Sequence, residues 1–99
     1  KMNGSAFSTY TVVTSEAFIL KSGSLKTVQV SENAFKSFCE HCGTPIYNQN
    51  SKLAGLKILY LGSIDKAPEI KPAINIYCES QLQWVHKLAA LPNFEQGVV

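Results

Sequence analysis

Residues 38–45 read Phe38-Cys39-Glu40-His41-Cys42-Gly43-Thr44-Pro45 and hold two of the three cysteines in the chain. Two cysteines separated by two residues can direct both thiolates at one ion, and a glycine after the second allows a tight backbone turn. A structural zinc takes four ligands in a tetrahedron, of which a C-x-x-C pair supplies half. The stretch therefore predicts half of a zinc knuckle, with Cys39 and Cys42 as metal ligands.

A disulfide or redox pair and unligated thiols are the alternatives for these cysteines. A thioredoxin-like C-x-x-C opens a helix inside a βαβ unit, where the helix N-terminus lowers the pKa of the first thiol. Here the second cysteine is followed by Gly43-Thr44-Pro45 and then by the strand-like Ile46-Tyr47. Without a helix the redox motif loses its physical basis, so the sequence favours zinc.

Length and composition indicate one small domain. Ninety-nine residues are enough for a core, but they are near the size at which a metal often helps to hold the fold. The net charge is only +2, and the nine lysines are scattered with no arginine among them, which argues against nucleic-acid binding. No apolar run approaches the roughly 20 residues of a membrane span. An odd number of cysteines with one close pair fits a reducing compartment, so we expect a cytoplasmic protein.

The remaining sequence reads as short strands followed by one helix. Strands are predicted over residues 6–13, 17–20, 25–30, 34–38, 46–48, 56–61 and 73–78, separated by turn residues or irregular connections. The nearly continuous apolar run 56–61 suits a strand buried on both faces. Ser80 and Gln83 form a capping-box pattern, after which Trp84 and Leu88 recur at helical spacing until Pro92. We therefore expect a mainly β domain with one short C-terminal helix packed on its sheet.

The third cysteine and the two histidines have ordinary structural interpretations. Cys78 is a candidate third ligand, but it shares a strand face with Ile74 and Ile76, so we expect a buried apolar thiol. His41 lies between the knuckle cysteines and is expected to point to solvent. His86 lies in the tail and is expected at the surface.

Other conspicuous side chains are also expected to be structural. Trp84 and Phe94 are predicted to be core anchors rather than a ligand cage, because large aromatics dominate burial in small domains. Asp65 and Glu69 lie in an irregular connection over residues 63–72 and are predicted to be solvated rather than an acid and base pair.

Spaced motifs along almost the whole chain carry a family resemblance. In order they are Gly4-Ser5-Ala6-Phe7, Gly23-Ser24-Leu25-Lys26, Phe38-Cys39, Cys42-Gly43-Thr44-Pro45-Ile46-Tyr47, Gly62-Ser63-Ile64-Asp65, Pro72, Ile76-Tyr77, Trp84 and Leu91-Pro92-Asn93-Phe94. This pattern resembles the glutathione-dependent formaldehyde-activating enzyme family, the centromere protein V/GFA-type zinc domain. The resemblance implies a single domain over residues 1–99 with a β-tent fold, in which small antiparallel sheets meet at an angle around a structural zinc.

The family pattern contains more cysteines than this chain. It carries an upstream C-x-C that completes the structural zinc site with the later C-x-x-C, and a C-x-C-x-x-C that holds a second, catalytic zinc. Aligned on residues 4–7, Lys1 falls just after the last of those cysteines, and Lys1 rather than Met opens the numbered sequence. We therefore expect a piece of a longer chain that lacks its N-terminal cysteine-rich segment. Only Cys39 and Cys42 carry over as ligands, and a catalytic zinc is expected only if upstream cysteines exist.

Two functions from different classes follow from the resemblance. The first is a carbon–sulfur lyase that joins formaldehyde, or another aldehyde, to glutathione as S-hydroxymethylglutathione. The second is a non-catalytic, zinc-stabilised binding or scaffold domain of the same fold. No catalytic residue is assigned within residues 1–99, and these residues alone are expected to be inactive. Asn75 stands where the family often has His before Ile76-Tyr77, so the substrate-site details of the family are not carried over to this chain.

Overall fold

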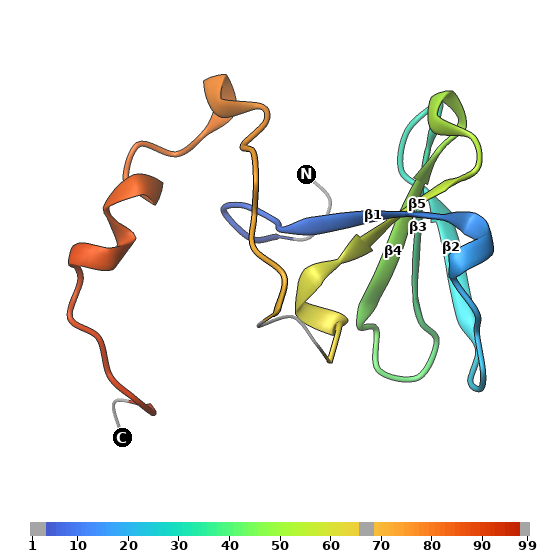
Figure 1. Ribbon diagram of the computed structural model, residues 1–99, viewed down its shortest axis with the longest axis horizontal. Helices are drawn as coiled ribbons and strands as arrows, with labels where there is room; N and C mark the ends of the chain where they lie inside the picture. The colour runs from blue at the N-terminus through green and yellow to red at the C-terminus, as the bar shows by residue number, and fades with distance from the viewer. Residues whose placement is uncertain (1–3, 66–68, 98–99) are drawn as a thin grey trace.

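The computed structural model describes residues 4–65 and 69–97. Its strands are β1 (Tyr10–Thr14), β2 (Leu25–Gln29), β3 (Ala34–Cys39), β4 (Pro45–Asn50) and β5 (Leu56–Tyr60). They form one antiparallel five-stranded sheet in the order β1-β5-β4-β3-β2. The prediction of a mainly β fold is confirmed. The described strands make one continuous sheet, in which β1 runs across the direction of β3 and β4 (Figure 1).

Short polar connections set the register of the central strands. The link from β4 to β5 contains the 3-10 turn η2 (Ser51–Leu53), where the Asn50 side chain accepts a 2.9 Å hydrogen bond from the Lys52 backbone N–H. The Ser51 hydroxyl donates to Asn33 Oδ1 at 2.8 Å, which ties this link to the turn between β2 and β3. Side-chain hydrogen bonds to the backbone are a common way to fix such turns. The two turns at this end of the sheet are thereby held together.

The sheet has a small core built from aromatic and polar side chains. Tyr10 pairs with Tyr60 across β1 and β5, with ring centroids 4.9 Å apart in an edge arrangement. Tyr60 is the one buried apolar side chain among the described residues, whereas the rest of the run 56–61 is half-buried. The prediction of a strand buried on both faces is therefore wrong, because too little chain covers either face of β5.

Elsewhere in the sheet, aromatic rings pack around a lysine. Phe18 contacts the Tyr47 ring at 5.0 Å between centroids. The Lys57 ammonium lies 5.4 Å from the Phe18 centroid and 5.0 Å from that of Tyr47, a cation–π arrangement. This cluster holds the segment after β1 against β4 and β5.

Four of the predicted strands, 25–30, 34–38, 46–48 and 56–61, are confirmed with small shifts of their ends. The first predicted strand starts later than expected, at Tyr10. The prediction for residues 17–20 is wrong: Ser15–Ala17 form the 3-10 turn η1, and no strand follows before β2. The prediction for residues 73–78 is also wrong, since residues 73–77 are irregular and Ile74 and Ile76 are 79% and 68% exposed. A stretch of alternating side chains forms a strand only where a neighbouring strand pairs with its backbone N–H and C=O groups.

The C-terminal tail is a series of turns. It contains the 3-10 helices η5 (Cys78–Ser80) and η6 (Val85–Ala90) rather than the predicted α-helix. Ser80 ends η5, and η6 begins after Trp84 with no side-chain cap, so the capping-box prediction is wrong. Without a continuous helix the spacing of the apolar residues produces no single face that could pack on the sheet.

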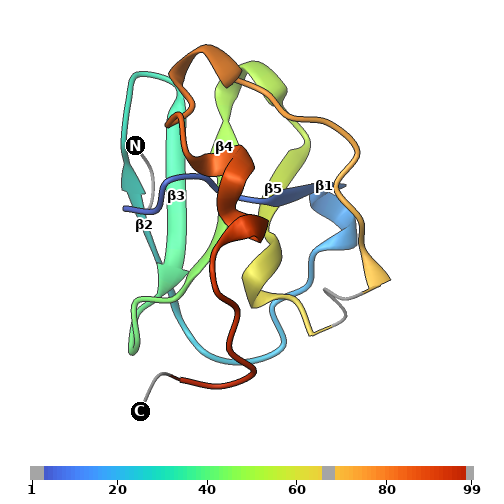
Figure 2. The ribbon, with the colours of Figure 1, turned by 90° about the vertical axis from the view of Figure 1, so that its left-hand side faces the viewer.

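The tail lies away from the sheet, as the orange and red segments of Figure 1 show. In the view of Figure 2 the same segment passes in front of the sheet. Trp84 is 51% and Phe94 65% exposed, so their prediction as core anchors is wrong. The radius of gyration is 15.4 Å, against about 13 Å for a compact chain of this length. The extended tail accounts for the difference.

The connection that follows β5 starts with the 3-10 turn η3 (Leu61–Ser63). Asp65 and Glu69 are exposed, as predicted, and residues 66–68 of the predicted irregular connection lie outside the described residues.

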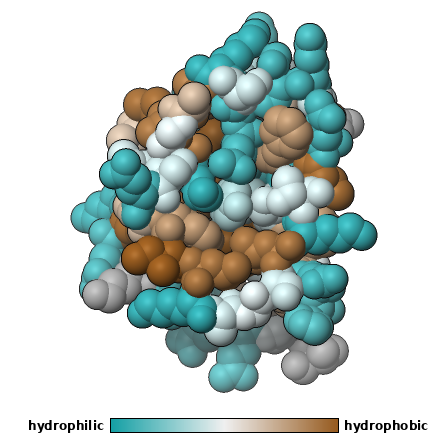
Figure 3. All heavy atoms as spheres, turned by 90° about the vertical axis from the view of Figure 1, so that its right-hand side faces the viewer, coloured by the Kyte–Doolittle hydropathy of each residue, from teal (hydrophilic) through white to brown (hydrophobic). Residues whose placement is uncertain are grey.

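On the side of the molecule that carries β2, an apolar band crosses the surface (Figure 3). Exposed apolar side chains in β1, in β2 and next to these strands are those of Val12, Ile19, Leu20, Val28 and Val30. Among the described residues, no helix has the length and apolar character needed to cross a bilayer.

Candidate metal site and adjoining pocket

The two predicted ligand cysteines lie on one tight turn between β3 and β4. Cys39 ends β3, and its backbone N–H donates to the Thr44 carbonyl at 2.9 Å. The Gly43 N–H donates to the Cys39 carbonyl, also at 2.9 Å. Gly43 has a φ of +76°, a left-handed conformation that glycine adopts without steric cost. The turn predicted from Gly43 and Pro45 is present, and neither cysteine is in a helix.

Hydrogen bonds around the turn favour the thiolate of Cys42. Its Sγ lies 3.0 Å from Thr44 Oγ1. The Thr44 hydroxyl, then the Thr44 backbone and the Cys39 thiol, lower the pKa of Cys42 from its ordinary value. As residues, Cys42 is exposed and Cys39 is half-buried. A thiolate is the form of cysteine that binds a metal ion.

The turn suits part of a zinc site. Cys39 and Cys42 lie on one turn, and hydrogen bonds lower the pKa of the Cys42 thiol. Such a pair can supply two of the four ligands of a tetrahedral zinc ion. Within residues 4–65 and 69–97, no cluster of three or more His, Cys, Asp or Glu side chains is placed to hold a metal ion. The pair therefore fits zinc as two of its four ligands.

The remaining candidate ligands lie apart from that turn or face solvent. Cys78 opens η5 and is exposed, so its prediction as a buried apolar thiol is wrong. The cause is the missing strand over residues 73–78, which would have turned Cys78 toward a core. His41 is exposed within the turn, as predicted, and His86 is exposed in η6, as predicted.

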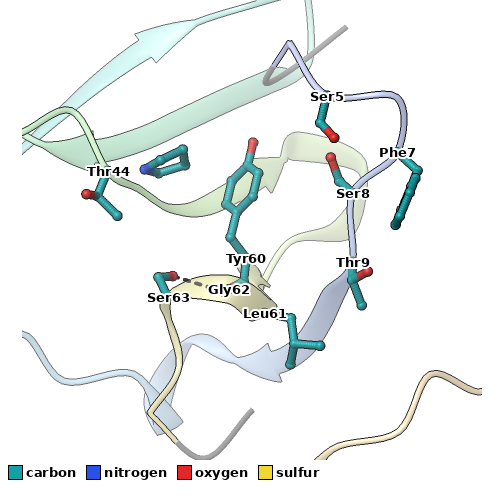
Figure 4. A pocket seen from close by; sticks show the side chains of 10 residues that line it. Ser5, Phe7, Ser8, Thr9, Thr44, Tyr60, Leu61, Gly62 and Ser63 are labelled. Carbon is teal, nitrogen blue, oxygen red and sulfur yellow. Dashed lines mark hydrogen bonds between the residues drawn. The ribbon is translucent and has the colours of Figure 1, made fainter. Parts of the chain in front are cut away.

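A pocket of about 470 Å³ adjoins the cysteine turn. Three segments form it: the residues that lead into β1, the residues that enter β4 and the end of β5 with η3. Figure 4 shows the Tyr60 ring between Thr44 on one side and Ser5 and Ser8 on the other. The lining residues are Ser5, Phe7, Ser8, Thr9, Thr44, Pro45, Tyr60, Leu61, Gly62 and Ser63.

Among the described residues, several that line the pocket carry hydroxyl groups and none is Asp, Glu, Lys or His, while most of the exposed wall is apolar. The Ser63 hydroxyl donates to the Tyr60 carbonyl at 2.9 Å, and the Leu61 N–H donates to the Thr9 carbonyl at 2.9 Å. Burial raises the pKa of Tyr60 above the ordinary tyrosine value, so its phenol stays neutral over the physiological range. Thr44 lines the pocket and contacts the Cys42 sulfur, which connects the pocket to the metal-ligand candidates.

Sequence reasoning found the cysteine turn and missed this pocket. Its walls come from residues 5–9, 44–45 and 60–63, which meet only because β1 pairs with β5 next to β4. The motifs at residues 4–7 and 62–65 were visible in the sequence, but small hydroxyl residues there carry no chemical signature by themselves. The pairing of the first strand with the run 56–61 was the missing information.

Comparison with known proteins gives one match. The model of a family described as glutathione-dependent formaldehyde-activating enzyme matches residues 1–80. Searches of curated proteins and of solved structures gave no match. The matched region includes the sheet, the cysteine turn and every residue that lines the pocket.

Proposed function

This chain belongs to the glutathione-dependent formaldehyde-activating enzyme family, and from that premise we propose that it is a domain of a zinc protein with carbon–sulfur lyase activity, to which ligand cysteines outside residues 1–99 contribute. Its substrates are glutathione and formaldehyde or another small aldehyde. The turn that carries Cys39 and Cys42 beside Thr44 is the observation that supports the proposal most directly. Residues 1–99 make up one domain in this proposal.

Cys39 and Cys42 are proposed as two ligands of a structural zinc. The backbone hydrogen bonds of the turn fix the two residues relative to each other, and the bonds to Thr44 favour the thiolate of Cys42. The free thiols of this chain suit a reducing compartment, so the proposal places the protein in the cytoplasm. A second, catalytic zinc belongs to the proposal only with further cysteines beyond this pair.

The proposed reaction is an addition without oxidation or reduction. The glutathione sulfur forms a bond to the aldehyde carbon, the π bond of the carbonyl breaks, and the thiol proton ends on the aldehyde oxygen. A zinc ion with an open coordination position, when bound, would lower the pKa of the glutathione thiol and so favour the nucleophilic thiolate. The sheet end next to Thr44 has a pocket beside the cysteine turn, and none of the described residues that line it is charged.

The experiment measures how fast ¹³C-formaldehyde and glutathione interconvert with S-hydroxymethylglutathione, by exchange NMR at fixed pH. The uncatalysed rate in the same buffer is the reference, since the adduct also forms spontaneously. The full-length gene product loaded with zinc is expected to exceed that rate, and Cys39→Ser and Cys42→Ser are expected to reduce the gain. Cys78→Ser is the matched control and should retain it. If the zinc-loaded full-length product does not exceed the reference, the lyase proposal fails, and a zinc-stabilised scaffold becomes the better assignment.

A further inference from the structure

We propose that two copies of this chain associate through β2 and form one continuous antiparallel sheet across a two-fold axis. β2 lies at one end of the strand order and pairs with β3 on one side only. A two-fold axis uses the same surface on both copies, so each copy contributes this strand. The proposal concerns the backbone of β2 and does not depend on the proposed reaction.

The hydrogen bonds to β3 show which backbone groups of β2 are already paired. The Val30 N–H donates to the Ala34 carbonyl at 2.9 Å. At the other end of the strand, the Glu40 N–H donates to the Ser24 carbonyl at 3.0 Å. In an antiparallel pair, hydrogen-bonded residues alternate with residues that are not hydrogen-bonded. The even-numbered residues of β2 therefore bond to β3.

The odd-numbered residues of β2 direct their N–H and C=O groups away from β3; they are Leu25, Thr27 and Gln29. The hydroxyls of Thr27 and Ser37, which oppose each other, lie 2.7 Å apart. This contact fits the assignment, because side chains lie closer in a pair without backbone hydrogen bonds. Among the described residues no strand pairs with the outer side of β2, which is the outermost strand on the left of Figure 2.

β2 lacks the features that usually protect an edge strand. Such strands carry Pro, a bulge or several charges, which prevent pairing with another chain. β2 has the sequence Leu25-Lys26-Thr27-Val28-Gln29, with one charge and no Pro, and it pairs with β3 in a single register. Residues 26–30 are exposed, including Val28 at 37% and Val30 at 43%. The other edge strand, β1, runs across the direction of β3 and β4 (Figure 1), so β2 is the better template for a further strand.

A second copy of β2 matches the hydrogen-bonding pattern of this edge. Outward groups must face outward groups, since each hydrogen-bonded pair exchanges both of its N–H···O bonds. A two-fold axis at Thr27 places Thr27 opposite Thr27 of the second copy, and Leu25 opposite Gln29 of the second copy. Every outward residue of β2 is then paired. An axis at Lys26 or at Val28 leaves one outward residue unpaired, and the axis at Lys26 also brings two lysines face to face.

The charges around β2 are complementary in the register centred on Thr27. Lys26 is the one charged residue of the strand, and it lies opposite Val28 of the second copy, where its aliphatic stem can pack on the valine. Lys21 precedes the strand and Glu32 follows it, and both are exposed. Antiparallel pairing brings the Lys21 end of each copy to the Glu32 end of the other. Opposite charges at both ends favour this orientation.

Amide hydrogen exchange, measured by NMR at low and at high protein concentration, tests the pairing residue by residue. The amides of Leu25, Thr27 and Gln29 are expected to become protected only at high concentration, because their hydrogen bonds form between copies. The amides of Lys26 and Val28 bond to β3 and should be protected at both concentrations. Sedimentation equilibrium in the same buffer is expected to show monomer and dimer. Contact between apolar surfaces alone would not follow this alternation.

Charge variants of Val28 test the register. In the symmetric dimer, each substituted side chain faces Lys26 of the other copy, so the effect occurs twice. Val28→Glu introduces attraction and Val28→Lys repulsion, whereas both remove the same exposed apolar side chain. The Val28→Glu dimer is expected to be about tenfold tighter than the Val28→Lys dimer. Val12→Lys, at an exposed valine of β1, is the matched control and should dimerise as the unmodified chain does.

Four results would overturn the proposal. The first is a protein that stays monomeric at the high concentration, and the second is protection of the outward amides at both concentrations, which would mean that another segment covers β2. The third is equal dimerisation of Val28→Glu and Val28→Lys. The fourth is a dimer that only Val12→Lys dissociates, which would place the interface at β1. If a Val28 variant does not fold, the exchange pattern of the unmodified protein still decides, and lyase activity bears on none of these results.

Discussion

The Tyr60 hydroxyl donates a 3.1 Å hydrogen bond to Asn48 Oδ1, and each of these two side chains is only 7% exposed. This contact joins β5 to β4 at the centre of a sheet with little other buried surface. Tyr60→Phe is expected to lower the free energy of unfolding by about 1–3 kcal/mol, because the buried Asn48 oxygen loses its partner. Urea denaturation measures the change. Tyr47→Phe is the control: the Tyr47 hydroxyl has no hydrogen bond among the described residues, and a loss as large as that of Tyr60→Phe would contradict the explanation.

The stability of the fold should decline in alkaline solution through Tyr60. Burial raises the folded pKa of Tyr60 above its ordinary value of 10.0, so the folded chain holds the phenol proton at pH values where the unfolded chain loses it. The stability contribution is therefore complete below pH 10.0 and is lost as the pH rises through the folded pKa. Denaturation at a series of pH values around this point measures the slope. Tyr60→Phe should give a shallower slope, and equal slopes for the two proteins would assign the loss to other groups.

Gly43 should resist replacement because of its backbone conformation. At a φ of +76° a residue with a Cβ is strained, even though an added Cβ meets no other atom within 4 Å. Gly43→Ala is expected to lower the free energy of unfolding by about 1–2 kcal/mol. Gly62→Ala is the control, since Gly62 has no positive φ and also has open space around it. Thermal unfolding followed by circular dichroism compares the two, and equal stability of both variants would be evidence against strain in the turn.

Zinc affinity should depend on how many ligands accompany Cys39 and Cys42. Two thiols provide half of a tetrahedral site, so residues 1–99 alone should bind zinc weakly, and Cys39→Ser should have a mild effect there. A completed structural site contributes about 10 kcal/mol or more of binding free energy to folding, so the same change in a zinc-loaded product in which further cysteines complete the site should cost several kcal/mol. Elemental analysis after dialysis against a chelator measures bound zinc. One tightly held zinc in the 99-residue chain that Cys78→Ser removes would identify Cys78 as a third ligand.

Residues 1–99 alone should not accelerate adduct formation between glutathione and formaldehyde. The reaction needs a zinc with an open position, and the described residues bring only two metal-ligating side chains together. Exchange NMR with zinc supplied, compared with the uncatalysed rate at matched pH, measures the effect. Acceleration that Cys78→Ala abolishes would show that a catalytic centre is built within this chain.

The sequence predicted those parts of the structure that depend on residues close together in the chain. The cysteine turn depends on Gly43 and Pro45, a few residues from the thiols that they position, and strands β2 to β5 follow one another through short links. The roles of Cys39 and Cys42 as ligands stay predictions. The alternation of residues 73–78 and the apolar spacing around Trp84 were misleading, since both patterns form a strand or a packed helix only against a covering surface.

The order of the sheet also has a consequence for folding kinetics. Strands β2 to β5 form a meander of neighbours in sequence, whereas β1 must return across the whole meander to pair with β5. Loop-closure entropy makes such a distant pairing slower than the formation of local hairpins. We therefore expect β1 to add last. The pocket, with walls on both sides of that final pairing, would then assemble only when the sheet is complete, so early folding intermediates would contain the cysteine turn without the pocket.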